Sequence, residues 1–117
     1  MTDIDLAELA GRLADVAILD VRTRGEFDGT VGNPCDPRQG HLPGARHLDV
    51  SRLMALDAPE LEAELGLTPG SEVVAYCHSG SRSAVATQIL LSLGYDARNY
   101  VGSWHEWSRH DELPIES

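Results

Sequence analysis

EVVAYCHSGSRSAVATQILLSL, residues 72–93, decides the fold more than any other stretch of the chain. It begins with a short apolar run from Glu72 to Tyr76, which is typical of a strand buried on both faces of a sheet. From Ser83 to Leu93 the apolar residues recur at helical spacing, and Gly94 follows as a helix C-cap would. A polar loop joins the two patterns. The stretch therefore predicts a strand, a loop and a helix in immediate succession.

The flanking sequence continues this alternation of helix and strand. Residues 5–13 are predicted to form an amphipathic helix, and residues 17–21 a second buried strand. Weaker patterns predict a further strand near 98–101 and short helices near 51–56, 59–65 and 103–109. Residues 28–39, DGTVGNPCDPRQ, are rich in turn-forming residues, so we expect an irregular surface loop that continues as a turn through residues 40–45. The alternation predicts an α/β fold with a doubly wound parallel sheet and helices on both faces.

Length and charge narrow the possible functions. The 117 residues fit a single domain, residues 1–117. The net charge is −10, and all nine basic residues are arginines, so nucleic acid is an unsuitable partner. No apolar run approaches the roughly 20 residues that span a bilayer, and the N-terminus is acidic where a signal peptide is basic. We therefore expect a cytoplasmic protein that does not enter membranes, with Cys35 and Cys77 as free thiols.

The loop that begins at Cys77 carries the chemistry. Ligands of open α/β sheets bind beyond the carboxyl ends of the strands, which is where this loop is predicted to lie. Its successive backbone N–H groups, together with the positive end of the following helix, can form an anion-binding cradle. Such a cradle lowers the pKa of a cysteine thiol and makes it a nucleophile. The alternative is that Cys77 is a small buried residue that only ends a strand.

The other loop residues, His78, Ser79, Gly80, Ser81 and Arg82, are candidates for binding the substrate. Arg82 is the candidate anion anchor, because its guanidinium is planar and permanently charged. Gly80 is expected to serve backbone geometry. Each polar side chain has a second interpretation, as an ordinary solvated loop residue or, for Arg82, as an exposed residue that opens a helix.

Four motifs in order give the chain a resemblance to the rhodanese, or thiosulfate sulfurtransferase, family. They are Asp20-Val21-Arg22 with Glu26-Phe27, then Gly40-His41-Leu42-Pro43-Gly44-Ala45, then the loop from Cys77 to Ser83, and last Gly102-Ser103-Trp104-His105-Glu106-Trp107. The resemblance implies a rhodanese-like sheet of about five strands and a persulfide carried on Cys77. It also implies that Asp20, Arg22 and Ser83 support the loop, that Trp104 and Trp107 pack near it, and that His41 is structural.

The length of the loop separates this chain from related folds. Phosphatases that resemble rhodaneses place five residues between the cysteine and the arginine, whereas four separate Cys77 from Arg82 here. The smaller ring favours a sulfur-centred substrate. A Cys-x-x-Gly-x-Arg loop looks like that of the thiosulfate users, with 3-mercaptopyruvate enzymes as the second choice. The insert at residues 28–39 resembles the catalytic half of tandem sulfurtransferases, and Cys35 within it is either a second sulfur-carrying thiol or incidental.

The predicted function is therefore sulfur transfer. A thiosulfate-like donor gives its outer sulfur to Cys77, and cyanide or a thiol, free or on a protein, accepts it. We expect no metal and no cofactor. Two alternatives remain: an inert rhodanese-fold interaction module, and a phosphatase or arsenate reductase.

Overall fold

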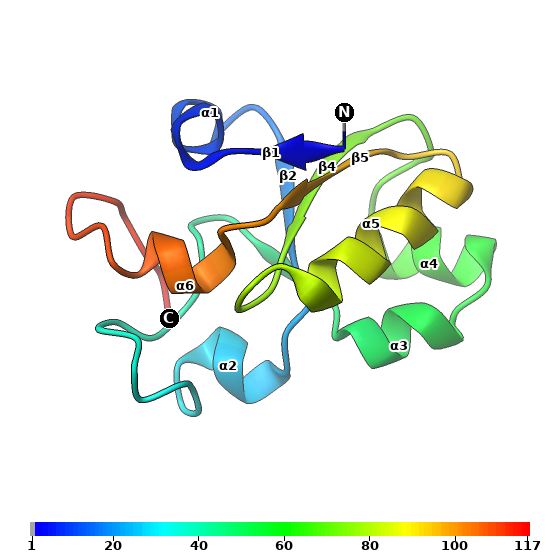
Figure 1. Cartoon of the computed structure of the whole chain (residues 1–117). Coiled ribbons are helices and arrows are strands. Elements are labelled where there is room, and N and C mark those ends of the chain that lie inside the picture. Colours follow the sequence, from blue (N-terminus) through cyan, green and yellow to red (C-terminus); the bar gives the residue numbers. More distant parts are fainter. Residues whose placement is uncertain (1) are drawn as a thin grey trace.

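The computed structural model describes residues 2–117, and its core is a single five-stranded parallel sheet with the strand order β1-β5-β4-β2-β3 (Figure 1). The strands are β1 (Asp3–Ile4), β2 (Ala17–Asp20), β3 (Arg46–His47), β4 (Glu72–Tyr76) and β5 (Asp96–Tyr100). The two-residue strands β1 and β3 lie at the edges, and the apolar strands β2 and β4 lie inside. The predicted parallel α/β sheet is confirmed.

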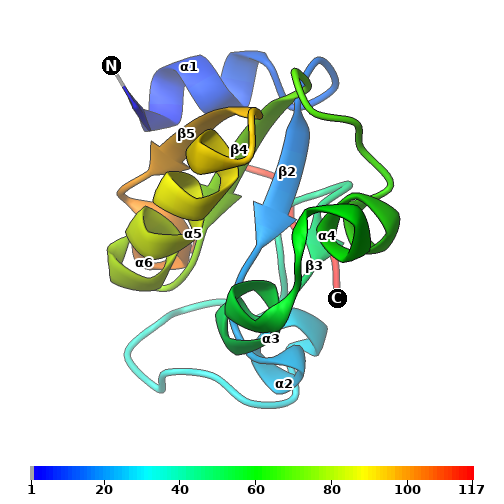
Figure 2. The ribbon, with the colours of Figure 1, turned by 90° about the vertical axis from the view of Figure 1, so that its right-hand side faces the viewer.

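Helices cover both faces of the sheet. They are α1 (Leu6–Gly11), α2 (Arg24–Asp28), α3 (Val50–Ala55), α4 (Ala58–Leu65), α5 (Ser81–Ser92) and α6 (Ser103–Trp107). Buried residues of α3, α4 and α5 share one core cluster with the sheet, and those of α1 and α6 share the other. Figures 1 and 2 show the same division, with α1 and α6 on the side away from α5. Alternate residues of β4 supply both clusters, as the period of a strand requires.

The sequence patterns locate most elements to within a few residues. β4 has the predicted bounds, and α5 begins at Ser81, two residues before the apolar stripe. Three elements were not expected: β1, β3 and α2. Helix α2 begins directly after its N-cap residue, Thr23. The Thr23 side chain accepts from the Glu26 N–H, and the Glu26 side chain accepts from the Thr23 N–H. The same reciprocal capping starts α4, whereas the expected helix over residues 5–13 is shorter and ends at Gly11.

The chain reverses direction across the sheet between β2 and β4, which is where ligands bind in folds of this kind. Asp20, the last residue of β2, is paired in register with Tyr76, the last residue of β4. Cys77 follows immediately, so the strand order brings the motif at residues 20–22 beside the cysteine loop.

The insert after α2 is irregular, as predicted, but it is fastened to the rest of the domain. The Arg38 guanidinium donates hydrogen bonds of 2.7–3.2 Å to four backbone carbonyls at and beyond the end of α6. A cation suits this position because the last carbonyls of a helix lack partners and carry partial negative charge. The insert is thereby held over α6 and next to the cysteine loop. No helix within residues 2–117 is both long and apolar enough to cross a membrane.

Candidate active site

Three hydrogen-bond donors converge on the sulfur of Cys77. The backbone N–H of Gly80 lies 3.1 Å from Sγ, the N–H of Ser83 lies 3.4 Å away, and the Ser83 hydroxyl lies 3.3 Å away. Ser83 is fully buried in the first turn of α5, so its N–H and hydroxyl both face inward. The sulfur therefore lies at the positive end of a twelve-residue helix. These donors surround the sulfur at the position where the sequence predicts an anion-binding cradle.

The cradle favours the thiolate. Burial raises the pKa of the Cys77 thiol, but hydrogen bonds from Ser83, Gly80 and Ser79 outweigh burial, and the net pKa lies below the ordinary value. A lowered pKa increases the fraction of thiolate at neutral pH, and the thiolate is the nucleophilic form. Cys77 is only 1% exposed, so the sulfur is shielded from bulk solvent.

Gly80 has a backbone conformation that other residues rarely adopt. Its φ is +96°, and a Cβ added there would lie 2.7 Å from the carbonyl oxygen of Val101. Only glycine meets both conditions without strain, and this conformation directs the Gly80 N–H toward Sγ. Gly80 therefore shapes the cradle.

Strand β5 and helix α6 hold the loop from behind. The Asn99 side chain donates to the carbonyl of Gly80 at 3.2 Å, and the Cys77 N–H donates to the Ser103 hydroxyl at 3.1 Å. Ser103 has a positive φ of 54°, the only non-glycine residue with one within residues 2–117, and its hydroxyl also donates to the Tyr100 carbonyl at 2.7 Å. Sequence analysis did not name Asn99 and gave Ser103 only as part of a motif without a role, because both act through contacts with distant parts of the chain.

Arg82 is paired with Glu26. The two guanidinium nitrogens lie 2.9 and 3.2 Å from the Glu26 carboxylate, and Arg82 remains about one-third exposed. Burial raises the pKa of Glu26, but Arg82 and the Thr23 cap outweigh burial and bring it to about 2. Glu26 is thus ionised throughout the neutral range. The Glu26 carboxylate compensates part of the positive charge of Arg82, and the role of Arg82 as an anion anchor stays a prediction.

His78 is held by the insert. Its Nε2 lies 2.8 Å from a carboxylate oxygen of Asp36, whose side chain is only 1% exposed. The backbone N–H of His105, in α6, donates to the His78 carbonyl at 2.9 Å. The remaining loop side chains, those of Ser79 and Ser81, are exposed. Asp36 is a further residue at the site that sequence analysis missed, because the insert carries no pattern that places it.

Asp20 and Arg22 form a buried ion pair beside the loop. The guanidinium lies 2.7 Å from the carboxylate, donates to the Gly40 carbonyl, and packs over the rings of Tyr76 and Trp104. The Tyr76 hydroxyl donates to Asp20 at 2.7 Å, and burial raises the pKa of Tyr76 well above its usual range, so the phenol keeps its proton. The pair thus connects β2, β4 and the turn at residue 40 behind the cradle.

The remaining motif residues pack within the domain rather than donate to the Cys77 sulfur. His41 stacks on Phe27 with ring centroids 3.7 Å apart and lies 2.7 Å from the Phe27 carbonyl through Nδ1. Trp104 and Trp107 are fully buried. Cys35 is an exposed free thiol in the insert, and Cys77 is also free.

A buried thiol held by helix-end N–H groups at the switch point of a parallel sheet places this chain among α/β proteins that carry a cysteine loop after a central strand. The model of the rhodanese-like domain family matches residues 5–110. The chain therefore belongs to the rhodanese-like family. The match begins at residue 5, whereas the motifs that carry the resemblance in Sequence analysis begin at Asp20.

Relatives and solved structures extend this assignment. A thiosulfate sulfurtransferase of Azotobacter vinelandii is 38% identical, over 92% of this chain and 43% of the relative. One of Pseudomonas aeruginosa is 34% identical, over 88% of this chain and 41% of the relative. The structure of a probable thiosulfate sulfurtransferase is 44% identical with a TM-score of 0.86, covering 99% of this chain and 48% of that one. The human single-domain sulfurtransferase TSTD1 is 30% identical with a TM-score of 0.75, covering 96% and 99%. The chain thus spans less than half the length of both curated relatives.

Proposed function

We propose that this chain is a sulfurtransferase in which Cys77 carries sulfur as a persulfide. The observation that carries the proposal is the convergence of three donors on Cys77 Sγ at the carboxyl end of β4. An anion at this position, thiolate or persulfide, meets preorganised N–H and O–H groups. The names of the relatives support thiosulfate as the donor.

The reaction divides into two balanced steps. The Cys77 thiolate attacks the outer sulfur of thiosulfate, a new S–S bond forms on Cys77, and the old S–S bond breaks so that sulfite leaves with the electron pair. A nucleophilic acceptor then attacks the outer sulfur of the persulfide and releases the Cys77 thiolate. Cyanide leaves this step as thiocyanate, and a thiolate leaves it as a new persulfide. Neither step needs an external oxidant or reductant.

The loop residues have distinct roles in this scheme. The backbone N–H groups of Gly80 and Ser83 stabilise negative charge on sulfur, while Arg82 supplies charge and His78 supplies hydrogen bonding at the rim for the dianionic donor. The exposed Ser79 and Ser81 contact the donor from the solvent side. An exposed free thiol at Cys35 supports a reducing compartment such as the cytoplasm, where thiol acceptors are abundant.

Steady-state kinetics with thiosulfate and cyanide tests the proposal. A covalent intermediate predicts ping-pong behaviour, seen as parallel double-reciprocal lines when both substrates are varied. 3-Mercaptopyruvate and an aryl phosphate serve as comparison substrates, and we expect thiosulfate to be the better sulfur donor and phosphatase turnover to be absent. Efficient phosphate release would contradict the proposal, as would the absence of thiocyanate with every sulfur donor, which would indicate an inert interaction module.

A further inference from the structure

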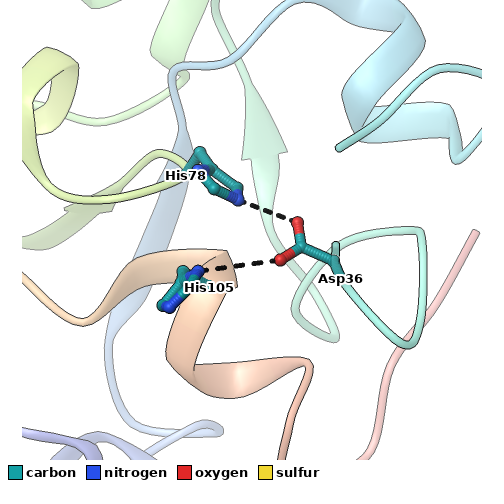
Figure 3. Close-up of side chains that lie close together, drawn as sticks. All are labelled: Asp36, His78 and His105. Atoms are coloured by element: carbon teal, nitrogen blue, oxygen red, sulfur yellow. Dashed lines mark hydrogen bonds and ion pairs between the residues drawn. The ribbon is translucent and has the colours of Figure 1, made fainter. Parts of the chain in front are cut away.

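Three metal-ligating side chains meet at the rim of the cysteine loop. Asp36 comes from the insert, His78 from the loop after β4, and His105 from α6, and one donor atom of each lies within 4.8 Å of the other two. Figure 3 shows both imidazoles turned toward the single carboxylate. The His78 Nε2 lies 2.8 Å from one Asp36 oxygen and the His105 Nδ1 lies 3.8 Å from the other. These residues belong to three separate segments, so no ligand spacing in the sequence reveals them.

We propose that Asp36, His78 and His105 form a binding site for one divalent transition-metal ion such as Zn²⁺. Two imidazole nitrogens and a carboxylate oxygen are a donor set that such ions prefer. Metal–ligand bonds of about 2.0–2.2 Å in a tetrahedral site place ligand atoms roughly 3.3–3.5 Å apart. The three side chains therefore need only small rotations to bind an ion.

The backbone around the cluster is already fixed. The N–H of His105 holds the carbonyl of His78 at 2.9 Å, so the two histidine segments cannot separate without breaking that bond. Their rings meet edge to face with centroids 5.5 Å apart. The carboxylate side chain of Asp36 is 1% exposed and hydrogen-bonded on both oxygens. Little ordering remains to be done when an ion binds.

The site is also open on one side. The side chain of His105 is 54% exposed and that of His78 is 22% exposed, so an ion can reach the donors from solvent. A fourth position is then available to water, as in zinc sites that have three protein ligands.

Arg109 is a cation that contacts the cluster, and its position is compatible with the ion. It donates to Oδ1 of Asp36 at 2.9 Å, while Oδ2 faces His78. Carboxylates that ligate metals are commonly hydrogen-bonded through their other oxygen, so Arg109 orients the ligand. Its charge also repels the ion, which predicts a reversible rather than a permanently filled site. Because His78 directly follows Cys77, a bound ion would couple metal binding to the loop of the proposed nucleophile.

Direct binding measurements test the site independently of sulfur transfer. Co²⁺ is titrated into Cys77→Ser, which removes the nearby thiolate, and the visible spectrum reports the ligands. We expect one Co²⁺ per chain with bands typical of nitrogen and oxygen ligands, no sulfur-to-cobalt charge-transfer band, and displacement by Zn²⁺. Adding His105→Ala should weaken binding at least tenfold, because a ligand contributes no less than the outer-shell partners that are worth about 10–100-fold.

A matched control comes from His110, which forms an exposed pair with Glu112 at 3.1 Å. His110→Ala in the same background should leave Co²⁺ affinity unchanged. His105 is exposed, so its replacement should preserve the fold, which circular dichroism checks. Absence of stoichiometric binding, equal affinity after His105→Ala, or a charge-transfer band that disappears with Cys35→Ser would each overturn the proposed ligand set.

Discussion

Replacing Ser83 tests whether the hydrogen bonds around Cys77 stabilise its thiolate, because the change can be made with little effect on packing. Its hydroxyl donates to Cys77 Sγ at 3.3 Å, and its backbone N–H donates to the same atom at 3.4 Å. Ser83→Ala removes only the hydroxyl, and alanine is a good helix former in the first turn of α5. The perturbation is therefore the loss of one hydrogen bond to the thiolate.

The size of the effect follows from that bond. A hydrogen bond to a charged group contributes about 1.5–3 kcal/mol, and the long contact to sulfur places this one near the lower end. About 1.4 kcal/mol corresponds to a factor of ten, so the thiolate fraction should fall about tenfold at a pH where most thiols are protonated. Hydrogen bonds to the thiolate lower the pKa of Cys77, so removing one raises that pKa.

The assay is the single-turnover rate of sulfite release from thiosulfate, measured across a pH series. Wild type should reach its plateau at lower pH than Ser83→Ala, and the two rates should converge at high pH, where both thiols are ionised. Ser92→Ala is the matched control, because Ser92 is exposed and lies at the other end of the same helix. An unchanged pH profile, or a loss of equal size at every pH, would refute the role of the hydroxyl in stabilising the thiolate.

Three further changes test other parts of the site. Asp20→Asn leaves Arg22 buried without its counter-ion and should destabilise the fold by about 3–5 kcal/mol in urea unfolding, and a loss below 1 kcal/mol would contradict this. Gly80→Ala imposes left-handed strain of about 1–2 kcal/mol on the loop. We expect the rate of persulfide formation to fall by a larger factor than this strain alone gives, because the backbone N–H of residue 80 turns away from Sγ. Arg82→Ala should raise KM for thiosulfate about ten- to hundredfold and leave sulfur delivery from a preformed persulfide unchanged. Glu26→Gln should lower KM for thiosulfate, because the positive charge of Arg82 is then no longer neutralised by a carboxylate. If Arg82→Ala slowed both half-reactions equally, Arg82 would have a structural role and would not bind the donor.

Local patterns predicted the middle strand of the sheet and the helix that follows it. β4 and α5 have a continuous apolar run and an apolar stripe, which depend only on neighbouring residues. The edge strands β1 and β3 are two residues long, too short for any period to show. Helix α2 is five residues long, and its only signal is the capping pair Thr23 and Glu26.

The residues of the candidate site were likewise predictable only where they are neighbours in the sequence. Cys77 and its loop were predictable because the strand, the loop and the helix are contiguous in the chain. Partners that arrive from elsewhere were not. Asp36, which bonds His78, is 42 positions from it in sequence, and Glu26 is 56 positions from Arg82. Sequence analysis therefore singled out Cys77 and its loop, but it did not predict that Asp36 and Glu26 hold the side chains of His78 and Arg82.

The persulfide itself is the most direct test of the account. Intact-mass spectrometry after incubation with thiosulfate should show a gain of one sulfur atom, and cyanide should remove it. The gain should map to the peptide that contains Cys77, persist in Cys35→Ser and be absent in Cys77→Ser. A sulfur gain that persists in Cys77→Ser and disappears in Cys35→Ser would contradict the assignment of Cys77 as the sulfur carrier.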